Sequence, residues 1–385
     1  MPDLTRRQTL AAAALASGAL LPERLPAMQD DTAPVTAPAP YAAVAMQLVA
    51  RSVERLKTRA EVTAQVKEHV AAITPQIRAA TIFIQQYGGA PVKLAVLPEY
   101  LFTSYPGRIG ISEFAAIAAF DVDGPEYAAI AGMAQQLGIF IAGNAYERDT
   151  NFPGLYFQAS FVIAPSGATV LRYRRLNSMF APTPHDVWSK YLDIYGIDGV
   201  FPVARTAIGN LSAIASEEIL YPEIARAHAL RGAEIFVHSS SEIGSPLATP
   251  KAIAKRARAM ENLAYVVSAN TAGISGSGLP AASADGNSLV VDWKGTVLSE
   301  ANSGETFTAF ADIDLHALRT ARRKPGMTNF LSRQRTAIFA AAYAGETHQR
   351  ADGLIKDKDI VVPDRDYFKR TSQEVIARLD KDGLI

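Results

Sequence analysis

Cysteine is absent from all 385 residues of the chain. This absence excludes disulfide bonds, thiolate metal ligands and a cysteine nucleophile together. Net charge is missing too, because 38 basic side chains balance 38 acidic ones, so we expect no nucleic-acid or anionic-membrane partner. Beyond the N-terminal region no stretch reaches the ~18 uninterrupted apolar residues of a membrane span.

Histidine is scarce as well, with six in the chain. The histidines are scattered, and none forms an HxxxH pair or a cluster with carboxylates at the spacing of metal ligands. The sequence therefore predicts no metal site and no cofactor. The length and the 49% hydrophobic content suffice for a substantial core, in one large domain or two ordinary ones.

The first thirty residues differ in composition from the rest. Arg6 and Arg7 precede an alanine-rich apolar run over residues 10–21, which is the order found in export signals. The paired arginines resemble a twin-arginine signal. We predict a signal region at residues 1–24, a Pro- and Ala-rich linker at 25–40 and export to the periplasm. The alternative is an alanine-rich helix that holds two arginines by chance.

Helical and strand-like segments alternate from residue 41 onward. Apolar residues three or four positions apart predict a long helix over 52–87, which Pro75 would kink or divide. Turn residues predict two hairpins, over 157–173 and 288–300. Apolar runs predict further strands at 94–97, 139–143, 211–215, 234–238 and 265–269, and spacing predicts helices at 127–137, 222–231 and 250–263.

This alternation predicts a layered α/β domain with a mixed sheet. No boundary interrupts residues 41–314, so we expect one domain there. Residues 315–385 would then form an extension that packs on the domain or on a partner subunit.

Two polar residues follow predicted buried strands. Glu99 lies just past strand 94–97, where ligands of open α/β sheets collect and where a desolvated carboxylate suits acid–base chemistry. Ser216 ends strand 211–215 ahead of a helix that begins at Pro222, which is a position for a nucleophile beside backbone N–H groups. The alternatives are a surface or capping glutamate and an ordinary turn serine, and no Gly-x-Ser-x-Gly motif is present.

Other charged and polar residues stand near the same strand ends. Arg174 and Arg175 close the first hairpin, where two cations are usually solvated. Asp186 follows in a loop that either returns over the crevice or makes a turn. Polar residues at strand ends favour a cleft used for binding or chemistry. We expect substrate-binding roles for Asp186, Glu218, His238 and Asn270.

Taken in order, these segments resemble the nitrilase or carbon–nitrogen hydrolase superfamily over about residues 41–314. The resemblance rests on Leu97-Pro98-Glu99, Tyr173-Arg174-Arg175, Tyr221-Pro222-Glu223, Arg256-Ala257-Arg258, Val267-Ser268-Ala269-Asn270 and Gly286-Asn287-Ser288. It implies an αββα sandwich that usually dimerises face to face. It also implies Glu99 as general base, Arg175 at the position of a lysine that stabilises the tetrahedral intermediate, and Ser216 at the position of the cysteine nucleophile.

The two replacements leave the activity open. A serine hydroxyl is far less acidic than a thiol and normally needs a histidine base held by a third group, while an arginine stabilises an oxyanion but does not donate a proton. Three interpretations follow: amidase-like hydrolysis of a non-peptide C–N bond, an inactive protein that binds a small carboxylate, amide or partner, and a chain that keeps only the fold. We expect membership of the hydrolase family, a small amide or carboxylate ligand, and a homodimer or larger homo-oligomer.

Overall fold

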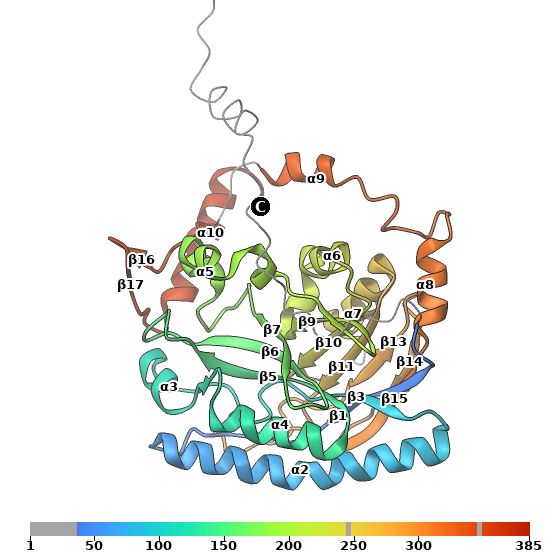
Figure 1. Cartoon of the computed structure of the whole chain (residues 1–385). Helices are drawn as coiled ribbons and strands as arrows, with labels where there is room; N and C mark the ends of the chain where they lie inside the picture. Colours follow the sequence, from blue (N-terminus) through green and yellow to red (C-terminus); the bar gives the residue numbers. More distant parts are fainter. Residues whose placement is uncertain (1–36, 244–247, 345–348) are drawn as a thin grey trace, which may run out of the picture. The chain divides into compact units, whose positions relative to one another are not determined.

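The computed structural model describes residues 37–243, 248–344 and 349–385. The predicted signal region and residues 25–36 of the predicted linker lie outside the described residues. From residue 37 onward the chain forms an α/β domain with two mixed sheets, flanked by helices (Figure 1). The αββα sandwich that the resemblance implied is therefore confirmed.

The first sheet has seven strands, in the order β15-β1-β3-β5-β6-β7 with β4 beside β5. β1, β3 and β5 are parallel to one another. β15 is antiparallel to β1, β6 to β5, and β7 to β6. The strands are β1 (Tyr41–Gln47), β3 (Val92–Val96), β4 (Phe120–Asp121), β5 (Phe140–Arg148), β6 (Phe157–Ile163), β7 (Thr169–Arg174) and β15 (Thr306–Ile313).

The second sheet has six strands, in the order β14-β13-β11-β10-β9-β8, of which β9, β10 and β11 are parallel. Its strands are β8 (Ala204–Thr206), β9 (Gly209–Ala215), β10 (Ile235–Ser240), β11 (Tyr265–Asn270), β13 (Leu289–Val291) and β14 (Val297–Glu300). Two small ladders pair β2 (Ala50–Arg51) with β12 (Ile274–Ser275) and β16 (Ile355–Lys356) with β17 (Asp359–Ile360).

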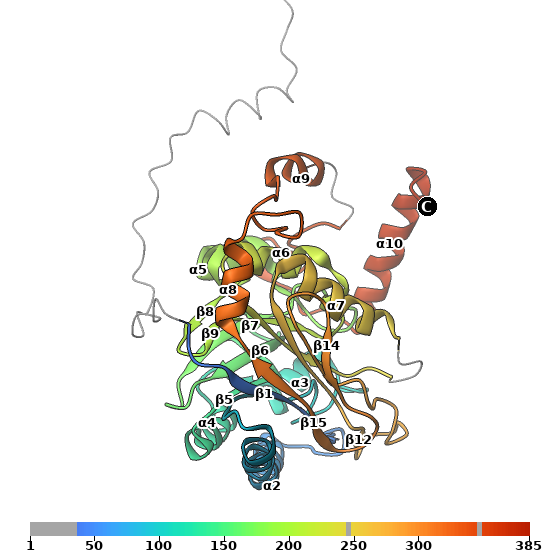
Figure 2. The ribbon, with the colours of Figure 1, turned by 90° about the vertical axis from the view of Figure 1, so that its right-hand side faces the viewer.

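Helices cover the outer faces of both sheets. In Figure 2, α2 and α4 lie below the first sheet and α6 and α7 lie above the second. The helices are α2 (Arg59–Gly88), α3 (Ile111–Ile117), α4 (Pro125–Leu137), α5 (Trp188–Val200), α6 (Pro222–Leu230), α7 (Pro250–Asn262), α8 (Leu315–Arg323), α9 (Thr336–Tyr343) and α10 (Tyr367–Lys381), with short 3-10 turns η1 (Pro184–Val187) and η2 (Ser216–Leu220).

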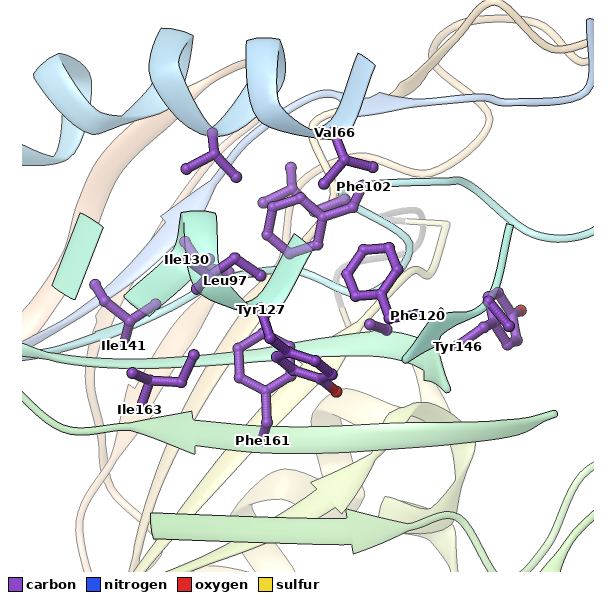
Figure 3. Packing of buried hydrophobic residues seen from close by; sticks show 14 of the residues in the cluster. Val66, Leu97, Phe102, Phe120, Tyr127, Ile130, Ile141, Tyr146, Phe161 and Ile163 are labelled. Atoms are coloured by element: carbon purple, nitrogen blue, oxygen red, sulfur yellow. The ribbon is translucent and has the colours of Figure 1, made fainter. Parts of the chain in front are cut away.

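Three buried apolar layers fill the sandwich. Figure 3 shows the layer between the helices and the first sheet, where Val66 of α2 and Ile130 of α4 lie over Ile141 and Phe161. A second layer lies between the two sheets, and a third between the second sheet and α6 and α7. Because side chains alternate along a strand, β10 contributes to both of these layers. Polar residues occupy the carboxyl end of β10, past these apolar layers.

Helix α2 corrects one prediction. It begins at Arg59, not at residue 52, because Thr58 and Glu61 form a capping box at its start. It then runs through Pro75 without a division. Pro75 lies on the exposed side of the helix, where water can satisfy the carbonyl group that proline leaves without its N–H donor. Buried residues on the opposite side continue the contact with the sheet to Ile84.

The other predicted elements lie within a few residues of the observed ones, apart from β5. That strand continues to Arg148, five residues beyond the expected end, because it pairs with β6 along its whole length. At the C-terminal end, Leu354 and Phe368 join the first apolar layer, so this part of the extension packs on the domain. Among the described helices, none is both long and apolar enough to cross a membrane.

Candidate active site

Glu99 lies three residues after the end of strand β3 at Val96, and its side chain is completely buried. Its Oε1 atom accepts a hydrogen bond of 2.6 Å from Nε2 of Gln158 and lies 3.7 Å from Nη1 of Arg175. The backbone N–H of Glu99 donates to the carbonyl of Ser240, at the end of β10 in the other sheet. A surface or capping role for this glutamate is therefore wrong.

Arg175 follows β7, and all three of its guanidinium nitrogens have partners. Nε donates to the carbonyl of Asn177 at 2.6 Å, Nη1 donates to Oε1 of Gln158 at 2.5 Å, and Nη2 is ion-paired with Glu217. Burial alone would lower the pKa of Arg175, but the carboxylates of Glu217 and Glu99 raise it above its usual value. Arg175 is thus a fixed cation inside the domain and not a solvated one.

Arg174, its neighbour, is buried on the other side of β7. It forms ion pairs with Glu147 and Asp149 at 2.8 and 2.7 Å. Successive side chains of a strand point to opposite faces. Arg174 therefore belongs to a structural ion-pair cluster, whereas Arg175 belongs to the candidate site. The expectation of two solvated cations is wrong for both residues.

Ser216 is the first residue after β9 and is 5% exposed. Its backbone has a φ angle of +50°, a left-handed conformation that is uncommon outside glycine and that concentrates at functional sites. Its carbonyl accepts from Nε2 of His238 at 2.8 Å, which holds the turn in place. Its hydroxyl Oγ accepts a hydrogen bond of 3.2 Å from Nζ of Lys251.

Lys251 was not predicted from the sequence. It lies in the first turn of α7, behind the Thr249 cap and Pro250, and its Nζ also contacts Oγ of Ser240 at 3.4 Å. Thirty-five residues separate it from Ser216, so no local spacing connects them. The one available signal was a lysine at the start of a predicted helix that follows a strand of the same sheet.

Gln158, the second residue of β6 in the first hairpin, was missed for the same reason. Its amide donates to Glu99 and to Oδ1 of Asn144, and it accepts from Arg175. Buried glutamines need such partners, but a strand sequence does not show which face will meet a carboxylate. These contacts, with the ion pair from Arg175 to Glu217, join Glu99, Gln158, Arg175 and the Ser216–Glu217 turn into one cluster that spans both sheets.

Glu218 holds the backbone of the segment that follows Arg175. Its Oε1 accepts from the backbone N–H groups of Leu176 and Asn177 at 2.7 and 2.9 Å, and its Oε2 accepts from the Tyr173 hydroxyl at 2.7 Å. Burial raises the pKa of Glu218 to about 7, although Arg175 and these hydrogen bonds oppose the rise. The structure thus places Glu218 as the anchor of the segment that carries Arg175.

The remaining predicted ligand-binding residues are engaged within the protein. Oδ2 of Asp186 accepts two 2.8 Å hydrogen bonds from Thr183 in a capping box, and burial raises the pKa of this carboxyl. His238 bonds Ser268 through Nδ1 at 2.8 Å, and burial lowers its pKa. Asn270 binds backbone groups of Glu242 and Gly286. Of these three, only Asp186 lines a cavity.

Two cavities flank the segment that follows β7. One, here called the aromatic cavity, has about 510 Å³ and is lined by aromatic side chains, by aliphatic ones such as Ile109 and Leu279, and by Ser241 and Arg365; the aromatic residues are Tyr100, Tyr105, Tyr146, Tyr156 and Phe180. The other, of about 480 Å³, lies between that segment, Glu217 and helix α10, with Asp186 on its wall. Of the cluster, Glu217 lines the second cavity, and Glu99 directly precedes Tyr100 of the first. No group of three or more metal-ligating side chains occurs in the part of the chain described.

Comparison with known proteins identifies the family. The sequence pattern of the carbon-nitrogen hydrolase family matches residues 43–323. The chain belongs to the carbon–nitrogen hydrolase family.

Several characterised or named relatives match parts of the chain. A hydrolase encoded beside pqqF in Pseudomonas protegens is 32% identical over 180 residues, which are 47% of this chain and 59% of that protein. A nitrilase of Pyrococcus abyssi is 27% identical, over 60% of this chain and 80% of its own length. The omega-amidase NIT2 of Danio rerio is 23% identical, over 69% of this chain and 92% of its own.

Solved structures share the fold. Nit3 of Saccharomyces cerevisiae superposes with a TM-score of 0.56 at 18% identity, over 76% of this chain and 98% of that one. The NitN amidase from Nesterenkonia superposes with a TM-score of 0.54 at 19% identity, over 78% and 99%. A variant of that amidase was solved with acrylamide added at its active-site cysteine.

Proposed function

We propose that the chain is an amidase-like hydrolase that cleaves the C–N bond of a small non-peptide amide, with Ser216 as its nucleophile. The observation that carries the proposal is the backbone of Ser216, held at a φ of +50° at a strand end beside a buried ion-pair cluster. A strained turn of this kind presents a hydroxyl group in a fixed direction.

The neighbouring residues supply the other roles of acyl transfer. Arg175 is a buried, permanent cation, suited to stabilise the negative oxygen of a tetrahedral intermediate. Glu99 has one carboxylate oxygen, Oε2, without a hydrogen-bond partner among the described residues. In this proposal that oxygen accepts the proton of the water molecule that hydrolyses the acyl-enzyme, as a general base.

The aromatic cavity fits an apolar acyl group. It begins at Tyr100, directly after Glu99, and at Ser241, directly after Ser240. Ligand pockets of this size accept small molecules and not folded chains. We therefore propose a non-peptide amide whose apolar or aromatic part lies against Tyr146 and Phe180, with its carbonyl group between Arg175 and Ser216.

The geometry favours catalysis over simple carboxylate binding. An arginine binds a carboxylate through a free fork of donors. Here each guanidinium nitrogen of Arg175 already has a partner, so a bidentate carboxylate would compete with Glu217 and Gln158. A single oxyanion needs only one of the N–H donors that remain among the five of this guanidinium, so it competes less with these partners than a bidentate carboxylate does.

Turnover of a panel of aliphatic and aromatic amides by the full chain tests the proposal. We expect carboxylate and ammonia release by the wild type and none by Ser216→Ala, because the nucleophile is removed. Ser166→Ala, in the exposed turn of the first hairpin, is the matched control and keeps full turnover. Hydrolysis that persists in Ser216→Ala would contradict the assignment.

Export remains part of the proposal. Arg6, Arg7 and the apolar run 10–21 support a twin-arginine route to the periplasm. Fractionation of cells that express the full chain and an Arg6→Lys, Arg7→Lys variant tests it, with loss of periplasmic protein expected only for the variant.

We also propose a homo-oligomer. Apolar residues stand exposed around α5 and α6, which supports a face that a second copy covers: Ile194, Ile197, Leu220, Tyr221 and Leu230. Light scattering after size-exclusion chromatography should give at least twice the monomer mass, and an Ile197→Glu, Leu230→Glu variant should give the monomer.

A further inference from the structure

Serine catalysis in this cluster needs a group that removes the hydroxyl proton, and the structure points to one. Ser216 Oγ has a single side-chain hydrogen-bond partner among the described residues, Nζ of Lys251 at 3.2 Å. Histidine, the usual base for serine, is not available there. Nε2 of His238 is committed to the backbone carbonyl of Ser216 and Nδ1 to Ser268.

Glu99 is placed less favourably for that proton. Its Oε1 atom is bound by Gln158 and lies beside the Arg175 cation, and no hydrogen bond joins Glu99 to Ser216 in the described structure. A general base must lie within hydrogen-bond reach of the proton that it takes. An amine has a conjugate acid close enough in acidity to serve a serine nucleophile, as in known serine–lysine pairs.

The neighbouring lysine shows what distinguishes Lys251. Lys255, one turn along α7, is fully buried and ion-paired with Glu242, so its ammonium group is held as a structural charge. Lys251 has no carboxylate within ion-pair distance in the described residues, and the groups that face it are two serine hydroxyls, the Lys255 ammonium and the His238 ring. Lys251 therefore has no carboxylate that would hold its ammonium group as a structural charge, and its hydrogen-bond partners are the two serine hydroxyls.

We propose that Lys251 is the catalytic base of acylation, in a Ser216–Lys251 pair, and that Glu99 serves the water of deacylation. This inference rests on the proposed function and assigns a residue to it. The neutral amine takes the Oγ proton as Oγ bonds to the amide carbon, and the π electrons of the carbonyl move to its oxygen beside Arg175. The C–N bond then breaks, and the Lys251 ammonium returns that proton to the leaving nitrogen, which departs as ammonia or an amine.

The second half restores the enzyme. Water attacks the ester carbon, its proton passes to Glu99, and the ester C–Oγ bond breaks. Oγ regains a proton from Glu99 by way of Lys251, and the carboxylic acid leaves. One amide and one water thus give one acid and one amine, with no other reactant.

The test uses an activated-serine probe and amide turnover on the full chain. A fluorophosphonate should label wild-type Ser216, identified by peptide mass, and Ser216→Ala should not react. Lys251→Met and Lys251→Arg should both reduce the labelling rate and kcat/KM by about 100-fold or more, the range of a lost general base. Arginine keeps the positive charge at the same helix start but does not deprotonate, so equal losses identify a base.

Controls separate this inference from the proposed function. Lys294→Met, at an exposed lysine, should label as the wild type does, and thermal unfolding checks that each variant is folded. Labelling that is normal in both Lys251 variants, or retained in Lys251→Arg alone, overturns the base assignment while Ser216 stays the nucleophile. A wild type that neither labels at Ser216 nor hydrolyses any amide overturns the proposed function itself. Recovery of Lys251→Ala by added small primary amines would support the pair directly.

Discussion

The side-chain amide of Gln158 donates a hydrogen bond of 2.6 Å from Nε2 to the carboxylate Oε1 of Glu99. The oxygen of the same amide accepts from Arg175 at 2.5 Å. One neutral side chain therefore fixes the separation of a buried anion and a buried cation, which lie 3.7 Å apart. Both charges depend on it for position.

Replacing this amide should impair the site without unfolding the domain. In Gln158→Leu, the Glu99 carboxylate loses a donor and Arg175 loses an acceptor, and hydrogen bonds to charged groups are worth about 1.5–3 kcal/mol. We expect kcat/KM to fall by roughly 10- to 100-fold. Steady-state kinetics on an amide substrate measure this, with Gln136→Leu on the exposed side of α4 as control. Unchanged kinetics would show that Gln158 only fills space.

The guanidinium of Arg175 should not be replaceable by the family's lysine. Arg175→Lys keeps the charge but cannot reach Asn177, Gln158 and Glu217 together. We expect kcat to fall by about 100- to 1000-fold, the range for a lost oxyanion donor. Arg172→Lys, on the same strand but paired with Glu147, should leave kcat close to that of the wild type. Equal effects of both substitutions would point to the strand and not to the site.

Glu218 predicts a pH dependence of stability. Its pKa is raised to about 7 by burial, so the folded state holds a proton that the unfolded state releases near pH 4.5. The stability that this proton contributes is complete below pH 4.5 and is lost as pH rises through 7.

Glu218→Gln removes that titration while keeping an acceptor for the backbone of the Arg175 segment. The unfolding free energy of the variant relative to the wild type should therefore rise with pH between 4.5 and 7, by on the order of 3 kcal/mol. Urea unfolding at pH 4.5, 5.5 and 7.5 measures the trend. Glu113→Gln, at an exposed position of α3, provides the pH-independent reference. A flat difference would mean that Glu218 stays ionised in the folded protein.

The C-terminal segment should contribute to the stability of the domain. Leu354 is 2% exposed, lies in the first apolar layer, and its N–H donates to the carbonyl of Asp186 at 2.9 Å. Leu354→Ala should lower the unfolding free energy by about 2–5 kcal/mol. Leu384→Ala, at a side chain that is 60% exposed, should change it by less than about 0.5 kcal/mol. Denaturant titration compares the two.

The alternation of helices with apolar runs predicted a layered α/β domain, because near-continuous apolar strands are buried on both faces, and the family resemblance then implied the αββα sandwich. Glu99, Arg175 and Ser216 could be predicted for a related reason, because each lies where an apolar run ends. Gln158 and Lys251 were not, because their roles depend on which strand and which helix meet across the site. The division of the helix considered at Pro75 did not occur for a similar reason, because packing of α2 against the sheet outweighed the local preference of proline for a break.

The candidate cluster takes Glu99, Gln158 and Arg175 from the first sheet and Ser216 and Lys251 from the side of the second. The two sheets contact each other mainly through apolar side chains, with few hydrogen bonds such as the one from the Glu99 N–H to the Ser240 carbonyl, so a small shift of one sheet against the other would displace the cluster. The rate of turnover would then depend on how the two sheets are aligned with each other. We expect it to disappear at urea concentrations at which circular dichroism still shows intact secondary structure.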